Sequence, residues 1–246
     1  METEKMIHEK DRRITSAFID SAVKLGVAQT VLLIQDNLTE CFNAMDCDGV
    51  IFQKKFNAFW VFTKMKVRFT DRPDWNDKIA IKTYPIDNAG LRTHVNSEIR
   101  DKEGKTLVVS NQELCVLSTQ THRPMKLFDL PFPKEGFPPA VFNEPFERFP
   151  GEFNDDDFIY EHTIRSYQID LSHHLNNIEY IKLALGVFDE AFLLSHKIKE
   201  LEVHYTGESK EGQLLKIYKH TQDKKIYIYI KESLRTVFEC CMEFDD

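Results

Sequence analysis

Two long stretches of the chain carry apolar residues at the spacing of an α-helix. The first stretch, over residues 27–45, is marked by Val31, Ile34, Leu38, Cys41 and Met45. The second is marked by Ile178, Ile181, Leu185, Phe188 and Phe192. Both also carry apolar residues off the main stripe, and Asp48-Gly49 gives the first a stop signal. A helix that is apolar over so much of its surface must be largely enclosed, so the pattern predicts a buried central helix in each half.

The segments that follow each helix alternate apolar and polar residues. After the first helix, the interleaved residues are Lys64, Met65, Lys66, Val67, Arg68 and Phe69. After the second, they are Ile226, Tyr227, Ile228, Tyr229 and Ile230. Such alternation is typical of antiparallel strands with one buried face. The order of elements therefore predicts an α+β fold, in which an antiparallel sheet curls round a long central helix once in each half.

The two halves also align with each other at a constant offset of 136 residues. The matched pairs are Met65 with Leu201, Val67 with Val203, Phe69 with Tyr205, Thr70 with Thr206, Ile79 with Leu215, and Ile81 with Ile217. The match is short, but it follows a predicted buried helix in both halves. This placement favours an internal duplication.

A proline-rich stretch separates the two halves. Seven of the nine prolines lie within residues 124–150. Because proline fixes φ and has no N–H donor, this stretch is not a regular element, and its phenylalanines indicate that it packs across a surface. The sequence therefore predicts an N-terminal unit over residues 1–120, an ordered linker over 121–156 and a C-terminal unit over 157–246.

Composition narrows the classes of function. A net charge of -8 and the lack of a basic run argue against a nucleic-acid partner. No apolar run approaches the ~20 residues that a membrane span needs, and the N-terminus has no apolar signal segment. The five cysteines lack metal-ligand spacing and are expected to be free thiols in a reducing cytoplasm. The 19 phenylalanines fit an apolar ligand site or simply an aromatic core.

The most polar cluster beside an apolar helix lies at the start of the second helix. It comprises Asp170, Ser172, His173, His174, Asn176 and Asn177. A helix N-terminus offers unpaired N–H groups and the positive end of the helix dipole, which keep a carboxylate ionised and can stabilise an oxyanion. The alternative is that Asp170 or Ser172 only caps the helix and that the histidines are solvent-exposed.

The repeat places another acid in the second half alone. At the offset of 136, Glu208 lies opposite Arg72, and the first half has no Asp/His cluster at its helix start over residues 25–30. This asymmetry predicts that the second half holds the chemistry. The alternative is that Glu208 is an ordinary hairpin residue.

Four segments of the chain resemble the acyl-acyl carrier protein thioesterases of plants and bacteria. Their D-x-N-x-H-V-N-N-x-x-Y signature is similar to Asp170-x-Ser172-x-His174-Leu175-Asn176-Asn177-x-x-Tyr180. Their E-Y-x-x-E-C strand resembles residues 201–209, and their W-V-x-T-x-M and Y-P-x-W-G-D blocks resemble residues 59–65 and 73–77. The resemblance covers nearly the whole chain. It implies a double hot-dog fold and hydrolysis of fatty acyl-carrier thioesters, which terminates fatty acid synthesis, with no metal and no cofactor.

The resemblance also implies a set of candidate catalytic residues. Asp170, His174 and Glu208 match the family's catalytic positions. Two further candidates depart from the pattern, since Ser172 stands at the family's Asn and Ser209 at its Cys. A cysteine nucleophile at that place is therefore excluded. Hydrolysis must use carboxylate and imidazole chemistry, either by activating water, which we favour, or through an acyl-aspartate anhydride.

Substrate binding is assigned to both halves of the chain. We expect Asn176 and Asn177 to contact the substrate beside the catalytic cluster. The first helix has no acid at its start, so we expect it to line a tunnel for the acyl tail. The residues expected to line that tunnel are Leu32, Leu33, Ile34 and Leu38.

The implied partner is acyl carrier protein, which is acidic like this chain and so requires a local basic patch for binding. The candidate patch is an outward stripe of Lys64, Lys66, Arg68, Lys78 and Lys82, which is alternatively a solvated sheet face. Hydrolysis of acyl-coenzyme A and non-catalytic acyl binding are the competing functions. The sequence leaves the oligomeric state open, a homodimer included.

Overall fold

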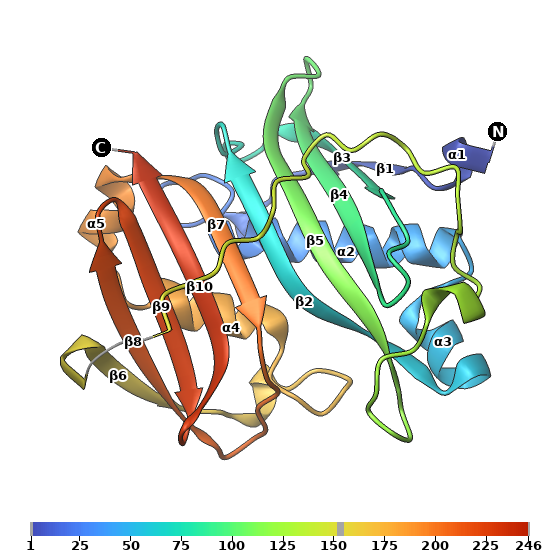
Figure 1. Cartoon of the computed structure of the whole chain (residues 1–246). Coiled ribbons are helices and arrows are strands. Elements are labelled where there is room, and N and C mark those ends of the chain that lie inside the picture. Colours follow the sequence, from blue (N-terminus) through green and yellow to red (C-terminus); the bar gives the residue numbers. More distant parts are fainter. Residues whose placement is uncertain (1, 152–154, 246) are drawn as a thin grey trace. The chain divides into compact units, whose positions relative to one another are not determined.

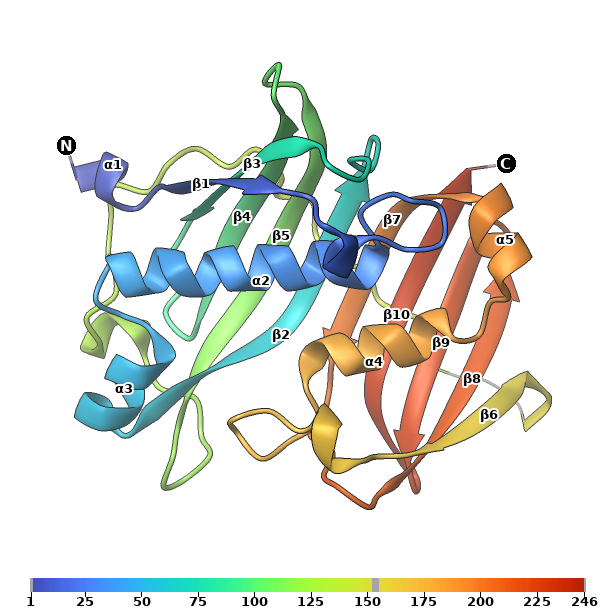
Figure 2. The same ribbon diagram turned by 180° about the vertical axis from the view of Figure 1, so that it is seen from behind.

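The computed structural model of the chain describes residues 2–151 and 155–245 (Figure 1, Figure 2). Residues 152–154, which belong to the predicted linker, lie outside the described residues, as do Met1 and Asp246. The chain divides into two compact units, residues 1–145 (unit 1) and residues 146–246 (unit 2). No helix within the described ranges has the length and hydropathy of a membrane span.

Unit 1 is an antiparallel sheet with a long helix across one face. Its helical elements are α1 (Glu2–Lys5), η1 (Ser16–Phe18), α2 (Val27–Ala44), α3 (Gly49–Phe56) and η2 (Leu127–Asp129). Its strands are β1 (His8–Arg13), β2 (Ala58–Phe69), β3 (Lys78–Pro85), β4 (Arg92–Asp101) and β5 (Thr106–Ser118). The strands pair in the order β1-β3-β4-β5-β2, and α2 packs on β1, β3 and β4 (Figure 2).

Unit 2 repeats this arrangement. Its helical elements are η3 (Asp155–Asp157), η4 (Ser166–Gln168), α4 (Asn177–Leu185) and α5 (Glu190–Ser195). Its strands are β6 (Phe158–Thr163), β7 (Lys197–Tyr205), β8 (Leu214–Gln222), β9 (Lys225–Glu232) and β10 (Arg235–Asp245). They pair in the order β6-β8-β9-β10-β7, which is the order of unit 1 shifted by five strands, and α4 packs on β9.

The predicted α+β fold with an internal duplication is confirmed. Each unit has a central helix on an antiparallel sheet, which is the hot-dog arrangement, and the pairs found at the offset of 136 occupy equivalent strands. Met65 on β2 and Leu201 on β7 are both fully buried, and so are Ile81 on β3 and Ile217 on β8. The alternation of apolar residues therefore located the inner face of both sheets.

Helix α2 follows the predicted first helix closely, since it begins at residue 27 and ends at Ala44. Ile34 and Leu38 are buried, whereas Leu32 is 41% exposed. Leu32 shares its exposed stripe with Asp36, one helical turn further on. The helix is thus enclosed over most of its surface, and one stripe, which includes Leu32, faces away from the core.

The second central helix is shorter than predicted. α4 ends at Leu185, and Phe192 belongs to the separate helix α5. At Gly186 the chain passes so close to β6 that a Cβ atom would lie 2.8 Å from the Tyr160 hydroxyl. The Asp189 side chain then accepts the N–H of Phe192 at 2.7 Å and starts α5. The prediction of one helix through Phe192 is wrong, because apolar spacing alone does not register a new cap.

The end of unit 1 crosses the outer face of its own sheet. Lys66 on β2 donates from Nζ to the carbonyl of Pro145 at 3.0 Å. Arg68 forms paired bonds with the Glu144 carboxylate at 2.7 and 2.6 Å, and its guanidinium lies 4.8 Å from the Phe142 ring centre. The predicted outward stripe is therefore wrong at Lys66, which is buried, whereas Arg68 stays partly exposed and pairs with Glu144.

The chain around Phe149 covers the outer face of the unit 2 sheet. The Phe149 ring stacks on His204 at 4.2 Å and meets the Tyr227 ring edge-on at 5.8 Å between centres. The Tyr229 hydroxyl donates to the carbonyl of Pro150 at 2.5 Å. Tyr227 and Tyr229 are consequently buried, although the alternation predicted one exposed face on β9. Both faces are covered because the segment before β6 packs across the outer one.

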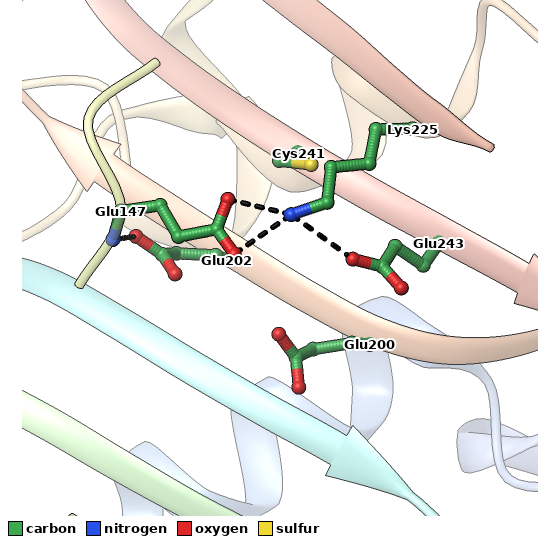
Figure 3. Close-up of a pocket in the computed structure, with 6 residues that line it drawn as sticks. All are labelled: Glu147, Glu200, Glu202, Lys225, Cys241 and Glu243. Carbon is green, nitrogen blue, oxygen red and sulfur yellow. Dashed lines mark hydrogen bonds and ion pairs between the residues drawn. The ribbon is translucent and has the colours of Figure 1, made fainter. Parts of the chain in front are cut away.

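Ion pairs anchor this covering segment to the sheet (Figure 3). Lys225 Nζ contacts both oxygens of Glu147 at 2.6 and 2.7 Å and Glu243 at 3.2 Å. The N–H of Glu147 donates to Glu202 at 2.7 Å. Burial opposes the charge of Lys225, but the two carboxylates outweigh it and raise the pKa of Lys225. These side chains and Cys241 line a small hollow. Their ion pairs hold the covering segment on the unit 2 sheet.

Phe149→Ala should lower the free energy of unfolding by about 3 kcal/mol, because the change removes a buried ring and leaves a cavity. Phe128→Ala is the matched control, since Phe128 is 46% exposed. The control should change stability by less than about 0.5 kcal/mol. Urea and thermal unfolding followed by circular dichroism measure both variants. Equal losses in the two would show that the segment does not contribute to the unit 2 core.

Candidate active site

The candidate catalytic residues of unit 2 lie in a tight turn just before α4. The N–H of Asp170 donates to the carbonyl of His174 at 2.9 Å, and the N–H of His173 donates to the carbonyl of Asp170 at 3.0 Å. His173 adopts a left-handed backbone with φ 64°. The N–H of Leu175 then donates to the carbonyl of Ser209 at 2.8 Å. This last bond ties the turn to the chain that follows β7.

The cap of α4 is Asn176, whose side-chain oxygen accepts the N–H of Ile178 at 2.9 Å. Asn177 is the first helical residue and is half-buried. Asp170 and Ser172 lie before the cap and do not satisfy the helix N–H groups, so the alternative that either residue caps the helix is wrong. Their side chains instead engage each other and His174.

Four side chains form a continuous chain of polar contacts. The Ser172 hydroxyl donates to Asp170 Oδ1 at 2.5 Å, and the N–H of Ser172 donates to the same oxygen at 2.8 Å. Ser172 Oγ lies 3.3 Å from His174 Nδ1. His174 Nε2 lies 3.2 Å from Glu208 Oε2. The structure thus brings together Asp170, Ser172, His174 and Glu208 in the order carboxylate, hydroxyl, imidazole, carboxylate.

Hydrogen-bond polarity fixes the orientation of the imidazole. A serine has one hydroxyl hydrogen, and Ser172 donates it to the Asp170 carboxylate, which only accepts. The Ser172 oxygen must then accept from His174, so Nδ1 of His174 carries a hydrogen. The opposite nitrogen, Nε2, faces the Glu208 carboxylate. Asp170 therefore orients the ring through Ser172, and Nε2 points to Glu208.

Glu208 is held by its main chain and leaves its carboxylate accessible. Arg235 Nη2 donates to the Glu208 carbonyl at 2.8 Å. A Cβ at Gly207 would lie 3.2 Å from atoms of both Arg235 and Val237, so glycine permits this close approach. The Glu208 side chain is 49% exposed and that of His174 is 22% exposed. Glu208 is therefore accessible to solvent, and so is Ser172.

Ser209 lies on the closed side of the same segment. It is fully buried, at 0% exposure. Its hydroxyl lies beside the phenol of Tyr180, whose pKa is raised to about 12 by burial. The structure therefore brings the Ser209 main chain to the site through Leu175 and keeps its hydroxyl away from the open end at Glu208.

Unit 1 contains the same turn, at an offset of 150 residues. The N–H of Asp20 donates to the carbonyl of Lys24 at 3.0 Å, and the N–H of Val23 donates to the carbonyl of Asp20 at 3.0 Å. Val23 has the left-handed backbone of its counterpart His173, with φ 61°. The alignment at an offset of 136 misses this turn, because unit 1 has a longer helical segment between the turn and β2.

Unit 1 has different side chains at the positions of three members of the unit 2 cluster. Ala22 stands at the position of Ser172, Lys24 at that of His174 and Arg72 at that of Glu208. Arg72 forms an ion pair with Asp20, and Lys24 pairs with Asp74 at 3.0 Å. No acid lies in the first turn of α2, as predicted, but Asp20 occupies the turn equivalent to that of Asp170. Arg72 pairs with this acid, and Lys24 stands at the position of His174.

The residues predicted to line the acyl tunnel lie on α2 of unit 1. Leu33, Ile34 and Leu38 are buried, and Leu38 packs in the core cluster that contains Phe42. Leu32 is 41% exposed and lies on the other side of the helix. Three of the four predicted residues are thus in the apolar interior of unit 1.

Two positioning residues were not predicted from the sequence. Gln168 is 4% exposed, and its side chain accepts the N–H of Arg165 at 3.0 Å and donates to Glu179 at 3.1 Å. Its carbonyl accepts the N–H of the cap residue Asn176 at 3.0 Å. Arg235 is the second such residue, because its guanidinium donates a hydrogen bond to the Glu208 carbonyl. Glutamine and arginine usually lie on the surface, so neither residue stands out in a linear pattern.

Comparison with known proteins identifies the same architecture over the whole chain. The model of the acyl-ACP thioesterase N-terminal domain matches residues 5–129, and that of the C-terminal domain matches residues 151–240. No curated protein sequence matches the chain.

The solved structures that are similar to this chain include two ACP thioesterases. An acyl-ACP thioesterase from Bacteroides thetaiotaomicron has a TM-score of 0.87 at 17% identity, with 100% of both chains covered. The 12:0-ACP thioesterase from Umbellularia californica has a TM-score of 0.84 at 15% identity, covering 98% of this chain and 97% of that chain. At these identities the likeness establishes the fold.

The duplicated hot-dog fold and the matched family models define a thioester hydrolase of the double hot-dog class. With family models matched over both halves, the chain belongs to the acyl-ACP thioesterase family. It is an enzyme that hydrolyses fatty acyl-ACP thioesters, so non-catalytic acyl binding is set aside.

Ser209→Cys introduces the residue that the family pattern has after the glutamate. We expect kcat/KM to change by no more than about threefold and the variant to resist iodoacetamide, because a thiol enclosed in apolar surroundings is unreactive. The unaltered protein treated with the same reagent is the control. A large gain in rate together with inactivation by alkylation would show that this side chain reaches the substrate.

Proposed function

We propose that the turn before α4, together with Glu208, is the catalytic centre that releases free fatty acid and ends fatty acid synthesis. The supporting observation is the chain of polar contacts from Asp170 through Ser172 and His174 to Glu208, whose side chain is half-exposed. Such a chain couples a fixed imidazole to a carboxylate that can take up a proton. In this proposal Ser172 takes part as a relay, and Ser209 supports the site through its main chain.

The proposed reaction uses water directly. Glu208 removes a proton from a water molecule, whose oxygen bonds to the thioester carbonyl carbon. The tetrahedral intermediate then expels the thiolate as the carbon–sulfur bond breaks, and the thiolate takes a proton from His174 Nε2. The proton on Glu208 returns to His174 across their 3.2 Å contact. Thioester and water thus become acid and thiol, and the enzyme regains its starting protonation.

Asp170 acts in this scheme by orienting and stabilising the charged imidazole. Its Oδ1 accepts two hydrogen bonds from Ser172, which lower the nucleophilicity of that oxygen. This arrangement supports water activation over an acyl-aspartate anhydride. The cysteines do not offer a nucleophile either, because all five are buried and burial raises the pKa of Cys41 and Cys241 to about 12.

We assign the acyl tail to unit 1 and the thioester to unit 2. The apolar helix α2, with Leu33, Ile34 and Leu38 buried, supports the first assignment. The charged turn of unit 2 supports the second. The five free cysteines support a reducing compartment, the cytoplasm, as the place where the enzyme works.

Asp170→Asn and His174→Ala should each lower kcat/KM by about 10²–10⁴, because each change breaks the proton-handling chain. Asp20→Asn is the matched control, since Asp20 occupies the same turn in unit 1. The control should retain its rate within about threefold, because Asp20 belongs to no such chain. Initial rates of palmitoyl-acyl carrier protein hydrolysis and thermal melts are compared for all three. Equal losses in Asp170→Asn and Asp20→Asn would remove the catalytic assignment from unit 2.

A further inference from the structure

Two segments of unit 1 contain no aspartate or glutamate, residues 49–70 and residues 114–128. The chain as a whole has 40 acidic residues against 32 Lys and Arg. These two segments therefore have a positive charge balance in a chain that is acidic overall. They form α3 and the neighbouring strands β2 and β5, where Ala58 pairs with Ser118. The fold therefore gathers two acid-free segments at one end of this strand pair.

Five basic side chains lie at that end. Lys54 and Lys55 are in the last turn of α3, and His122, Arg123 and Lys126 follow β5 (Figure 1). We call this set the basic end. The carbonyl of Asn57, just after α3, accepts the N–H of Thr119 at 2.8 Å. The ring of Phe59 meets that of His122 with centres 6.1 Å apart. These contacts join the two parts of the basic end into one surface.

The basic end is exposed, and Lys54 has an electrostatic interaction with Asp48, which lies at the other end of α3. Lys54, Lys55, Arg123 and Lys126 are all solvent-exposed. Within the described part of the chain, none of these four side chains forms an ion pair or hydrogen bond. By contrast, Arg72 of the same unit is paired with a carboxylate. The positive charge of the basic end is therefore available to another molecule.

Helix electrostatics explain only part of this cluster. Lysines in the last turn of a helix favour its negative dipole end, which accounts for Lys54 and Lys55. The same effect does not apply to Arg123, which lies in a loop. That loop is ordered, because the Ser118 hydroxyl accepts the N–H groups of Gln120 and Thr121 at 3.2 and 3.3 Å. The loop thus presents a cation from a fixed scaffold, beside a helix end of the same sign.

We propose that the basic end is the docking surface for acyl carrier protein. This inference rests on the proposed function, since an acidic protein carries the substrate. The chain's net charge of -8 repels such a partner, so productive encounter needs a local positive surface. Phe128, which is 46% exposed and follows Lys126 by two positions, adds an apolar contact of the kind found at interface centres. The stripe on β2 offers less free charge, because Lys66 is buried and Arg68 is paired with Glu144.

The test reverses the charge of the basic end and of a matched site. Lys54→Glu combined with Lys55→Glu is the docking variant, and Arg123→Glu is a second one. Lys197→Glu combined with Lys199→Glu is the control, because both of these β7 lysines are exposed. Substrates are palmitoyl-acyl carrier protein and S-palmitoyl-pantetheine, which lacks the acidic protein. Fluorescence anisotropy of labelled holo-acyl carrier protein measures binding independently of hydrolysis.

The docking variants should lose roughly tenfold in kcat/KM for the protein substrate, through KM, and should lose the dependence of binding on ionic strength. Their turnover of palmitoyl-pantetheine should match that of the unaltered enzyme and of the control. Docking variants that lose no more than the control would overturn the proposal.

The binding measurement separates this proposal from the proposed function. If the unaltered protein binds labelled carrier but hydrolyses neither substrate, the proposed function fails, and weaker binding by the docking variants still upholds the surface. If it hydrolyses palmitoyl-pantetheine but does not bind the carrier, the docking surface is overturned and the hydrolytic centre stands.

Discussion

The arrangement of the candidate site depends on one main-chain hydrogen bond, from the N–H of Leu175 to the carbonyl of Ser209 at 2.8 Å. It fastens the turn that carries the acid and the imidazole to the residue that follows Glu208. A buried N–H cannot lose its partner without a free-energy cost, so this bond fixes the distance between two distant parts of the chain. His174 and Glu208 are consequently held 3.2 Å apart before any substrate binds. Such preorganisation is what proton transfer in catalysis requires.

Unit 1 builds the same main-chain turn with different side chains. There the N–H of Leu25 donates to the carbonyl of Pro73 at 2.8 Å, and the turn holds Asp20 in the equivalent position. The difference lies in the side chains, because Arg72 pairs with the acid and no histidine adjoins it. The main-chain turn therefore forms with either set of side chains. The shared main-chain bonds build both turns, and a few side chains decide which of them can handle protons.

The fold was predictable from the sequence because burial of Met65 and Leu201 follows directly from strand alternation. The candidate site was predictable in its residues, since Asp170, Ser172 and His174 are neighbours in the chain. Other features depend on which distant residues the fold brings together. The Asp20–Arg72 pair is one example, and the covering of Lys66 by the end of unit 1 is another. Local periodicity carries no information on such contacts.

Glu208→Arg gives unit 2 the basic residue that Arg72 provides in unit 1, and so tests most directly whether side chains alone separate the two turns. The measurement is the single-turnover rate of palmitoyl-acyl carrier protein hydrolysis, with a thermal melt to establish folding. We expect the rate to fall by at least about 10² with an unchanged melting temperature. The arginine would pair with Asp170, and the proton acceptor Glu208 would be absent. A folded variant with a rate within about twofold of the unaltered enzyme would contradict this expectation.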